Sequence, residues 1–272
     1  MIKKQWLQLR YVLGLGVLFI VLVKIGFFID FIFHRLFNIP YDSLSVGITG
    51  IIVQAVAFTV VIGVGLKDHH KTLASVCLIK KVNGKVWGAA IVCFIGFTLF
   101  DFYLTALFYS FSYGWDTRFS KREGYFLIKL IDNAIIPAVA EELLFKGLIF
   151  TILKKYYSTI ASVIFASLMF AVLHLTPIRI IPLFLCSCFT FWIYLRSGSL
   201  ILPVIQHFIN NLFADVLISE PFASLGTFYA ALAMFVIGAY MMYSLNKTER
   251  AKSKAKAINN EELSINNEEK EK

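Results

Sequence analysis

The chain is unusually apolar for its length. It has 272 residues, of which 58% are hydrophobic and 16% are charged, and 27 of them are phenylalanine. A soluble globular domain has about 45–50% apolar and about 25% charged residues, and a chain this apolar would expose more hydrophobic surface than solubility tolerates. The composition therefore excludes an ordinary soluble protein and predicts an integral membrane protein.

The net charge of +9 does not indicate a nucleic-acid-binding protein. Most lysines and arginines lie at the ends of apolar runs and in short loops, which is the placement that sets the topology of membrane proteins. The cysteines, Cys77, Cys93, Cys186 and Cys188, have neither a disulfide framework nor the spacing of a zinc knuckle. We expect no nucleic-acid partner and four cysteines that act as small apolar side chains.

Eight apolar runs are candidates for membrane crossing. A crossing helix needs about 20 apolar residues at a rise of 1.5 Å per residue, and helices are the spanning structure open to a sequence without strand-like alternation. The predicted fold class is all-α, a polytopic membrane helix bundle of about eight transmembrane helices. The runs are 11–33, 45–66, 86–111, 125–153, 158–175, 179–195, 199–218 and 225–244.

The distribution of basic residues predicts the orientation. With eight spans, five basic segments fall on the same side of the membrane. They are the N-terminus, the 67–85 loop, the 154–157 turn, Arg196 and the start of the tail. The opposite loops carry little positive charge apart from Arg118, Lys121 and Arg122. Basic loops stay on the cytoplasmic side, so we predict a multi-pass protein of the cell membrane with both termini cytoplasmic.

The composition changes once along the chain. Residues 1–244 are predicted to form one transmembrane bundle, whose motifs fall between about 120 and 220. Residues 245–272 are rich in Lys, Glu and Asn and have almost no large apolar residues. Such a segment does not bury enough apolar surface to fold, so we predict a disordered, charged cytoplasmic tail.

The fourth run contains two adjacent carboxylates, in the segment IPAVAEELLFKG from Ile136 to Gly147. Ionisable groups are costly within a membrane and usually face the interior of the bundle. Lys146 lies four residues after Glu142 on the same helix face, in the favourable order for an ion pair. Glu141 points about 100° away. It has no local counter-charge, which makes it a candidate general base.

Two later runs carry histidine. His174 ends the fifth run, and the seventh contains His207 and Asn211. A lone histidine in an apolar helix is most simply an interhelical hydrogen-bonding group. A hairpin turning near residue 156 would, however, bring His174 to within about 6 Å of Glu142 in depth, with His207 at a similar level. We expect the three groups to meet inside the bundle.

Other charged residues also lie in the apolar runs, Asp215 in the seventh run among them. Lys24, Asp30 and Lys129 are placed toward the ends of spans, where long side chains reach the interface. Asp101 and Asp132 are more central, and the sequence leaves open whether they are structural partners or members of a site.

These motifs resemble those of a known family. Glu-Glu-x-x-x-Lys at 141–146, Phe-x-x-x-His at 170–174 and His-x-x-x-Asn at 207–211 are similar to the signature of the CPBP intramembrane proteases, also called the CAAX-protease and bacteriocin-processing (Abi) family. The family pattern has Arg where this chain has Lys146. Lysine keeps the charge and loses the planar bidentate fork, so the ion pair with Glu142 should persist with a less fixed geometry.

The resemblance implies an enzyme, an intramembrane endopeptidase. Carried over to this sequence, it implies that Glu141 and His174 activate water for peptide-bond hydrolysis. His207 and Asn211 would then stabilise the oxyanion, a role that requires donors placed where charge develops. The residues expected to support this site are Glu142, Lys146 and Phe170.

The cofactor is left open between zinc and none. A second mechanism described for the family treats Glu141, His174 and His207 as ligands of a catalytic zinc, and two histidines with one carboxylate suit that metal. The sequence lacks the His-Glu-x-x-His helix of zincins.

The expected partner, besides the bilayer, is a membrane-associated peptide or protein substrate. A prenylated CAAX-like tail, a peptide pheromone and a bacteriocin precursor all fit, and the oligomeric state is not indicated. The alternative from another class is a non-catalytic membrane immunity or regulatory protein that binds a peptide or a sensor kinase, which the Lys146 departure favours. A transporter would predict inverted repeats, and the sequence has none.

Overall fold

The computed structural model describes residues 2–37, 43–113, 126–216, 226, 228–241 and 243–244, and every regular element within them is helical. The predicted all-α class is therefore confirmed. The predicted tail 245–272 and the loop residues Arg118, Lys121 and Arg122 lie outside the described residues. The elements are α1 (Ile2–Leu36), α2 (Ser43–Asp68), α3 (Leu73–Val76), α4 (Gly84–Tyr113), α5 (Phe126–Lys129), η1 (Leu130–Ile135), α6 (Ile136–Glu142), η2 (Leu143–Ile149), α7 (Phe150–Leu153), α8 (Thr159–Leu173), η3 (Pro177–Arg179), α9 (Ile180–Ser197), α10 (Ile201–Val216) and a further helix Phe228–Met241.

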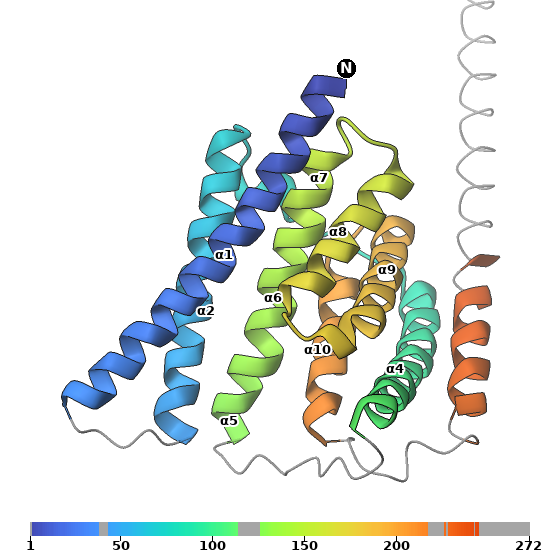
Figure 1. The fold of residues 1–272 in the computed structure, drawn as a ribbon. Helices are drawn as coiled ribbons and strands as arrows, with labels where there is room; N and C mark the ends of the chain where they lie inside the picture. The colour runs from blue at the N-terminus through green and yellow to red at the C-terminus, as the bar shows by residue number, and fades with distance from the viewer. Residues whose placement is uncertain are drawn as a thin grey trace, which may run out of the picture.

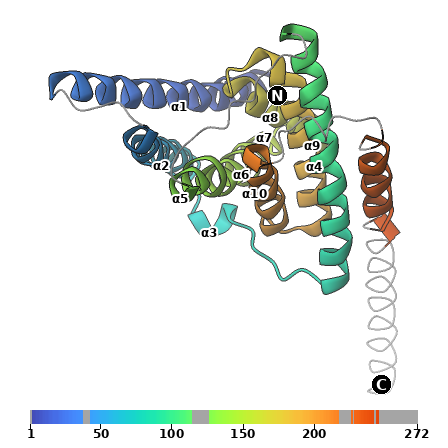
Figure 2. The ribbon, with the colours of Figure 1, turned by 90° about the horizontal axis from the view of Figure 1, so that it is seen from below.

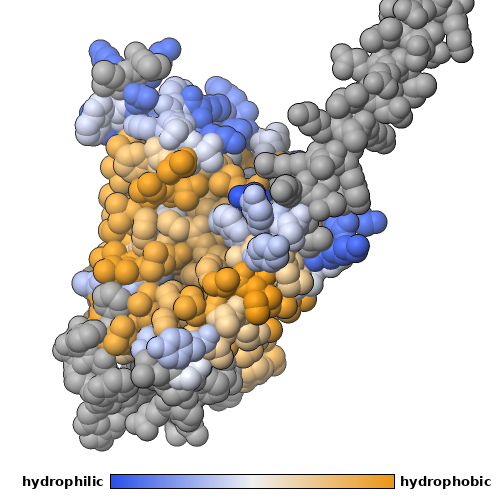
Figure 3. Space-filling model, turned by 90° about the vertical axis from the view of Figure 1, so that its right-hand side faces the viewer, coloured by the Kyte–Doolittle hydropathy of each residue, from blue (hydrophilic) through white to orange (hydrophobic). Residues whose placement is uncertain are grey.

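Four of the described helices are long and apolar enough to cross a membrane: Lys3–Leu36, Leu44–Asp68, Gly84–Leu107 and Pro177–Ser197. Many large apolar side chains on them are exposed, among them Phe28, Ile52 and Ile91. Figure 3 shows the resulting apolar band on one face of the molecule, with hydrophilic residues gathered beyond one end of it. Such a surface suits lipid and not water, and the chain is an integral membrane protein.

The predicted count of about eight spans is not confirmed. Three other apolar helices are short, namely Thr159–Leu173, Ile201–Phe213 and Phe228–Met241. The 15 residues of α8 extend over about 22 Å, less than the hydrocarbon thickness of about 30 Å.

Segment 126–153 forms one helical column, α5–η1–α6–η2–α7, in the middle of the bundle (Figure 1). Around it lie α1 and α2, the α8–α9 hairpin and α10, and the view from below shows α10 beside α6 (Figure 2). The apolar interior has two clusters, and α9 contributes to both: Phe191 and Tyr194 to one, Phe189 and Ile193 to the other. Helix α9 therefore joins the two halves of the bundle.

The α8–α9 hairpin is defined by local backbone signals. Ser158 caps the start of α8, and its Oγ accepts a hydrogen bond from the Ala161 amide at 3.2 Å. Leu175 follows the end of α8 with φ of +52°, a left-handed conformation that a branched side chain seldom adopts. In Figure 1 the turn that follows lies above the lower ends of α2, α5 and α10. His174 is thereby placed within the depth of the bundle.

Helix α4 and helix Phe228–Met241 are in close backbone contact. A Cβ added to Gly96 would lie 2.3 Å from the Phe235 amide nitrogen, and one added to Gly238 would lie 2.4 Å from the Cys93 nitrogen. Small residues allow such contacts between membrane helices, where dispersion forces replace the hydrophobic effect. The four cysteines are free, as predicted, and Cys93 and Cys186 are buried.

This contact predicts opposite effects for two glycine substitutions in α4. Gly96→Ala should lower the free energy of unfolding by about 1–3 kcal/mol, because the new methyl group overlaps the facing backbone. At Gly88, where a Cβ would meet nothing within 4 Å, the same change should be neutral or stabilise by about 0.5–1 kcal/mol. Unfolding of the purified variants in detergent measures both. Equal effects at the two positions would contradict the close contact.

Candidate active site

The column that carries the two adjacent carboxylates departs from regular α-helix on both sides of them. Turns of π-helix, η1 and η2, precede and follow α6, and Pro137 lies in the first turn of α6. Proline has no amide hydrogen and its ring clashes with the carbonyl four residues earlier, so the wider turn of η1 accommodates it. Such π segments recur at functional sites, and here they flank Glu141 and Glu142.

Glu142 is buried and makes two charged contacts. Its Oε2 forms an ion pair with Nζ of Lys146, and both side chains are only 1% exposed. Its Oε1 lies 3.0 Å from Nδ1 of His207. The Lys146 ammonium also lies 4.5 Å from the centroid of the Phe191 ring, where the π face attracts a cation. The predicted ion pair between Glu142 and Lys146 is confirmed.

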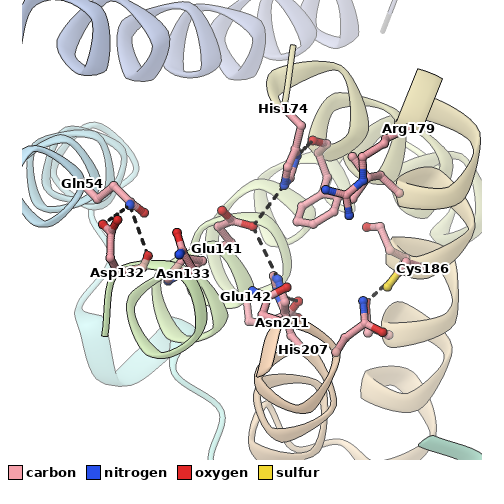
Figure 4. Close-up of a pocket in the computed structure, with 16 residues that line it drawn as sticks. Gln54, Asp132, Asn133, Glu141, Glu142, His174, Arg179, Cys186, His207 and Asn211 are labelled. Atoms are coloured by element: carbon pink, nitrogen blue, oxygen red, sulfur yellow. Dashed lines mark hydrogen bonds and ion pairs between the residues drawn. The ribbon is translucent and has the colours of Figure 1, made fainter. Parts of the chain in front are cut away.

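Glu141 faces both histidines. Its Oε2 lies 3.9 Å from Nε2 of His174 and 3.8 Å from Nε2 of His207, and its side chain is 14% exposed. Figure 4 shows the carboxylate between the two rings. Both distances exceed those of direct hydrogen bonds and are of the size at which a water molecule between the groups has to be considered. The three sequence motifs therefore do meet within the bundle.

The hydrogen bonds of the two imidazoles fix where their protons lie. Nδ1 of His174 is 2.7 Å from the carbonyl oxygen of Phe170, and a carbonyl only accepts. Nδ1 of His207 faces the Glu142 carboxylate, which is ionised by its pairing with Lys146 and also only accepts. Both Nδ1 atoms therefore carry hydrogen. In the neutral rings the Nε2 lone pairs point at Glu141.

Phe170 packs against both imidazoles. Its ring centroid is 4.7 Å from that of His174 and 5.8 Å from that of His207. It also meets Phe145 edge to face at 5.2 Å and is 4% exposed. The ring thus fills the space behind the two histidines, consistent with the supporting position expected for it.

These groups line a cavity of about 300 Å³. Asn211 borders it, next to His207 on the same helix face. Its described wall comprises Gln54, Asp132, Asn133, Pro137, Glu141, Glu142, Phe170, His174, Arg179, Leu183, Cys186, Ser187, Thr190, His207, Asn210 and Asn211. A smaller apolar pocket of about 60 Å³ adjoins it and shares Glu141, Phe170 and His174 with it.

The two aspartates that the sequence left open both have hydrogen-bond partners. Asp101 is 4% exposed and accepts a bond from Nδ2 of Asn210 at 3.2 Å. Asp132 accepts one from Nε2 of Gln54 at 2.8 Å and lines the cavity. Asp101 is thus a structural partner behind the wall, while Asp132 is part of the wall itself.

The three charged residues predicted to lie toward span ends, Lys24, Asp30 and Lys129, differ in their surroundings. Asp30 is part-buried and accepts a hydrogen bond from Thr49 at 2.6 Å, with His34 3.6 Å away. Lys24 is exposed. The side chain of Lys129 lies outside the described residues.

Sequence reasoning missed Gln54 and Arg179 as cavity residues. Gln54 is a neutral residue in the second apolar run. The one sequence feature that could have identified it as a cavity residue is its polar amide among apolar neighbours. Arg179 was assigned to the beginning of a span, although it follows His174 by only five residues. A turn placed inside the bundle brings that arginine to the cavity.

The donor chemistry of a zinc site is present, but its geometry is not. Two imidazole nitrogens and a carboxylate are ligands that zinc takes. Zinc holds nitrogen and oxygen at about 2.0–2.2 Å. In the part of the chain that the structure describes, no group of three His, Cys, Asp or Glu side chains has an arrangement that could hold a metal ion. No chemical step is therefore assigned to a metal.

The buried ion pair predicts a large effect of one substitution. Lys146→Met should lower the free energy of unfolding by about 3–5 kcal/mol, because it leaves the Glu142 charge buried without a counter-ion. Adding Glu142→Gln should restore most of that loss. Lys154→Met, at the exposed end of the same column, is the control and should change stability by less than about 0.5 kcal/mol.

Denaturant unfolding in detergent measures all these variants. A Lys146→Met protein as stable as the wild type would show that the lysine does not compensate Glu142.

One of three comparisons with known proteins gave a match, and it covers the segment that carries most of this site. Residues 123–213 match the family model described as "Type II CAAX prenyl endopeptidase Rce1-like". That segment is about a third of the chain and contains α6, α8, α9 and the histidine of α10. Neither the comparison with curated proteins nor that with solved structures gave a match. Segment 123–213, which carries the two adjacent carboxylates and both histidines, is thus similar to the type II CAAX prenyl endopeptidases.

Proposed function

We propose that the protein is an intramembrane endopeptidase that uses a glutamate-activated water molecule. The observation that carries the proposal is the Glu141 carboxylate, 3.9 Å and 3.8 Å from the Nε2 atoms of two histidines at the wall of a polar cavity. A partly exposed carboxylate with two basic nitrogens beside it is an arrangement suited to general-base catalysis. The match to a prenyl endopeptidase family supports a protease.

The first step is attack by water on the scissile carbonyl. A water molecule held by Glu141 Oε2 and His174 Nε2 donates one hydrogen bond to each acceptor, so that its oxygen lone pair is directed at the carbonyl carbon. As the new C–O bond forms, Glu141 takes the proton and negative charge moves to the carbonyl oxygen. His174 is held in this orientation by its bond to the Phe170 carbonyl, 2.7 Å away.

The second step is collapse of the tetrahedral intermediate. Asn211 donates its amide hydrogen to the oxyanion, and His207 donates from Nε2 when its ring carries both protons, a state that the Glu142 carboxylate stabilises through Nδ1. The C–N bond then breaks, and protonated Glu141 returns its proton to the leaving amine. The products are a carboxylic acid, which keeps the second proton of the water, and an amine; transfer of that proton to Nε2 of His174 and on to solvent leaves the carboxylate, so the atoms and charges balance.

The substrate class is a membrane-associated peptide or protein. The candidates are a prenylated CAAX-like tail, a peptide pheromone and a bacteriocin precursor, each of which offers a peptide bond close to the membrane. The alternative is a non-catalytic immunity or regulatory protein that binds a peptide or a sensor kinase there, and the lysine at position 146 in place of the family's arginine is what favours it.

Substitution of the base tests the reaction. Glu141→Gln keeps the shape of the side chain and removes the base, so cleavage should fall by a factor of about 10² to 10⁴. His174→Ala should lower it to a similar extent. The measurement compares, by mass spectrometry, the peptides released by cells that express each variant with those released by the wild type.

Asp68→Asn, at the end of α2 and outside the cavity wall, is the control and should release the wild-type peptides. Unchanged release by Glu141→Gln cells would exclude the endopeptidase, and protection or signalling that persists in that variant would support the alternative. Metal analysis of the purified protein, with activity measured in the presence and absence of a chelator, decides whether zinc is required.

We also propose that both termini lie in the cytoplasm. The basic segments around Lys3, Lys67, Lys154 and Arg196 support this orientation by the positive-inside rule. Fusions of a reporter that is active only in the cytoplasm should be active at either terminus and inactive when inserted at residue 120. Activity at only one terminus would require an odd number of crossings.

A further inference from the structure

Arg179 has no role in the hydrolysis described above, although it faces the same cavity. It ends η3, and its backbone is held by a hydrogen bond from its amide to the carbonyl of Thr176 at 2.9 Å. Figure 4 shows its side chain directed into the cavity from the side of α9, near His174. It is the one Lys or Arg among the described residues that line this cavity.

Among the described residues, none accepts a hydrogen bond from the guanidinium or pairs with it. Its Nε is buried without a hydrogen bond, and the residues that the structure describes place no carboxylate within ion-pair distance of it. Asp101 is close enough to attract it electrostatically. The Asp101 carboxylate, however, takes its hydrogen bond from Asn210. Buried donors in native proteins are nearly always satisfied, so a group that enters the cavity is the natural acceptor.

The charges of the cavity are separated. Asp132 lies at the wall formed with Gln54, Glu141 is central, and Arg179 lies at the opposite side (Figure 4). A peptide that binds across Glu141 therefore has one end near an acid and the other near an arginine. A carboxylate on the substrate is repelled from the first end and attracted to the second, where the guanidinium can bind both of its oxygens.

We propose that Arg179 is a specificity-determining residue that binds a carboxylate of the substrate on one side of the scissile bond. This proposal rests on the proposed function and adds to it the chemical group that sets the direction of binding. Both a C-terminal main-chain carboxylate and an Asp or Glu side chain offer the required chemistry.

The test compares peptides that differ only in that group. The probes are three mixtures of synthetic peptides of randomised sequence: free C-terminal acids, C-terminal amides, and amides with one Asp at varied positions. The purified full-length protein in lipid vesicles is incubated with each mixture, and products are identified by mass spectrometry. Wild-type protein should cut the acids, or the Asp-containing amides, about tenfold or more faster than the plain amides.

Arg179→Gln should bring that ratio toward one, and Arg179→Lys should retain part of it because lysine keeps the charge and loses the fork. Arg196→Gln, at the other end of α9, is the matched control and should keep the wild-type ratio. A preference for acids identifies the terminal carboxylate, and a preference for Asp-containing amides identifies a side chain. An unchanged ratio in Arg179→Gln, even with lower stability, would overturn the proposal.

A binding measurement separates this proposal from the proposed function. Fluorescently labelled acid and amide probes are titrated into vesicles that carry Glu141→Gln, alone and combined with Arg179→Gln. Tighter binding of acids that is lost in the double variant would support Arg179 even if wild-type protein cleaves nothing, which would count against the endopeptidase alone. Equal binding of both probes by the two variants would overturn the carboxylate site.

Discussion

The site depends on a single buried carboxylate, that of Glu142. One oxygen pairs with Lys146 and the other contacts Nδ1 of His207. Burying an ion pair rarely adds stability over apolar packing, whereas leaving one of its charges unpaired is costly. The main effect of this ion pair is therefore to position His207, not to stabilise the fold. The ion pair keeps Glu142 ionised, so Nδ1 of His207 carries the hydrogen and Nε2 faces Glu141.

The adjacent carboxylate differs because of a rotation of about 100° along the helix. Glu142 points into the packed interior and Glu141 into the cavity, where its side chain is 14% exposed against 1% for Glu142. The two adjacent glutamates thus have different roles: Glu142 supports His207 electrostatically, and Glu141 is the proposed reactive group. The two carboxylates lie at the end of α6, which begins with Pro137 in its first turn and has a π-helical turn on either side.

Sequence patterns predicted the parts of this molecule that depend on local spacing. The Glu142–Lys146 pair follows from a four-residue separation on one helix, and the meeting of Glu141, His174 and His207 followed from depth counting across one turn. The predicted span count is not confirmed, because hydropathy does not fix where a helix ends: α8 ends at Leu173, just before the left-handed residue Leu175. Arg179 and Gln54 were missed because tertiary packing alone brings them to the cavity.

The positions of the two histidines depend on an apolar residue, Phe170. Its ring lies against both imidazoles, with centroids 4.7 Å and 5.8 Å away, so its bulk limits how far either histidine can shift away from Glu141. Variation at this position would retune both histidines together, without altering any group that exchanges a proton. The volume of the side chain at position 170 therefore limits which substitutions the site accepts, as much as the identity of its polar groups does.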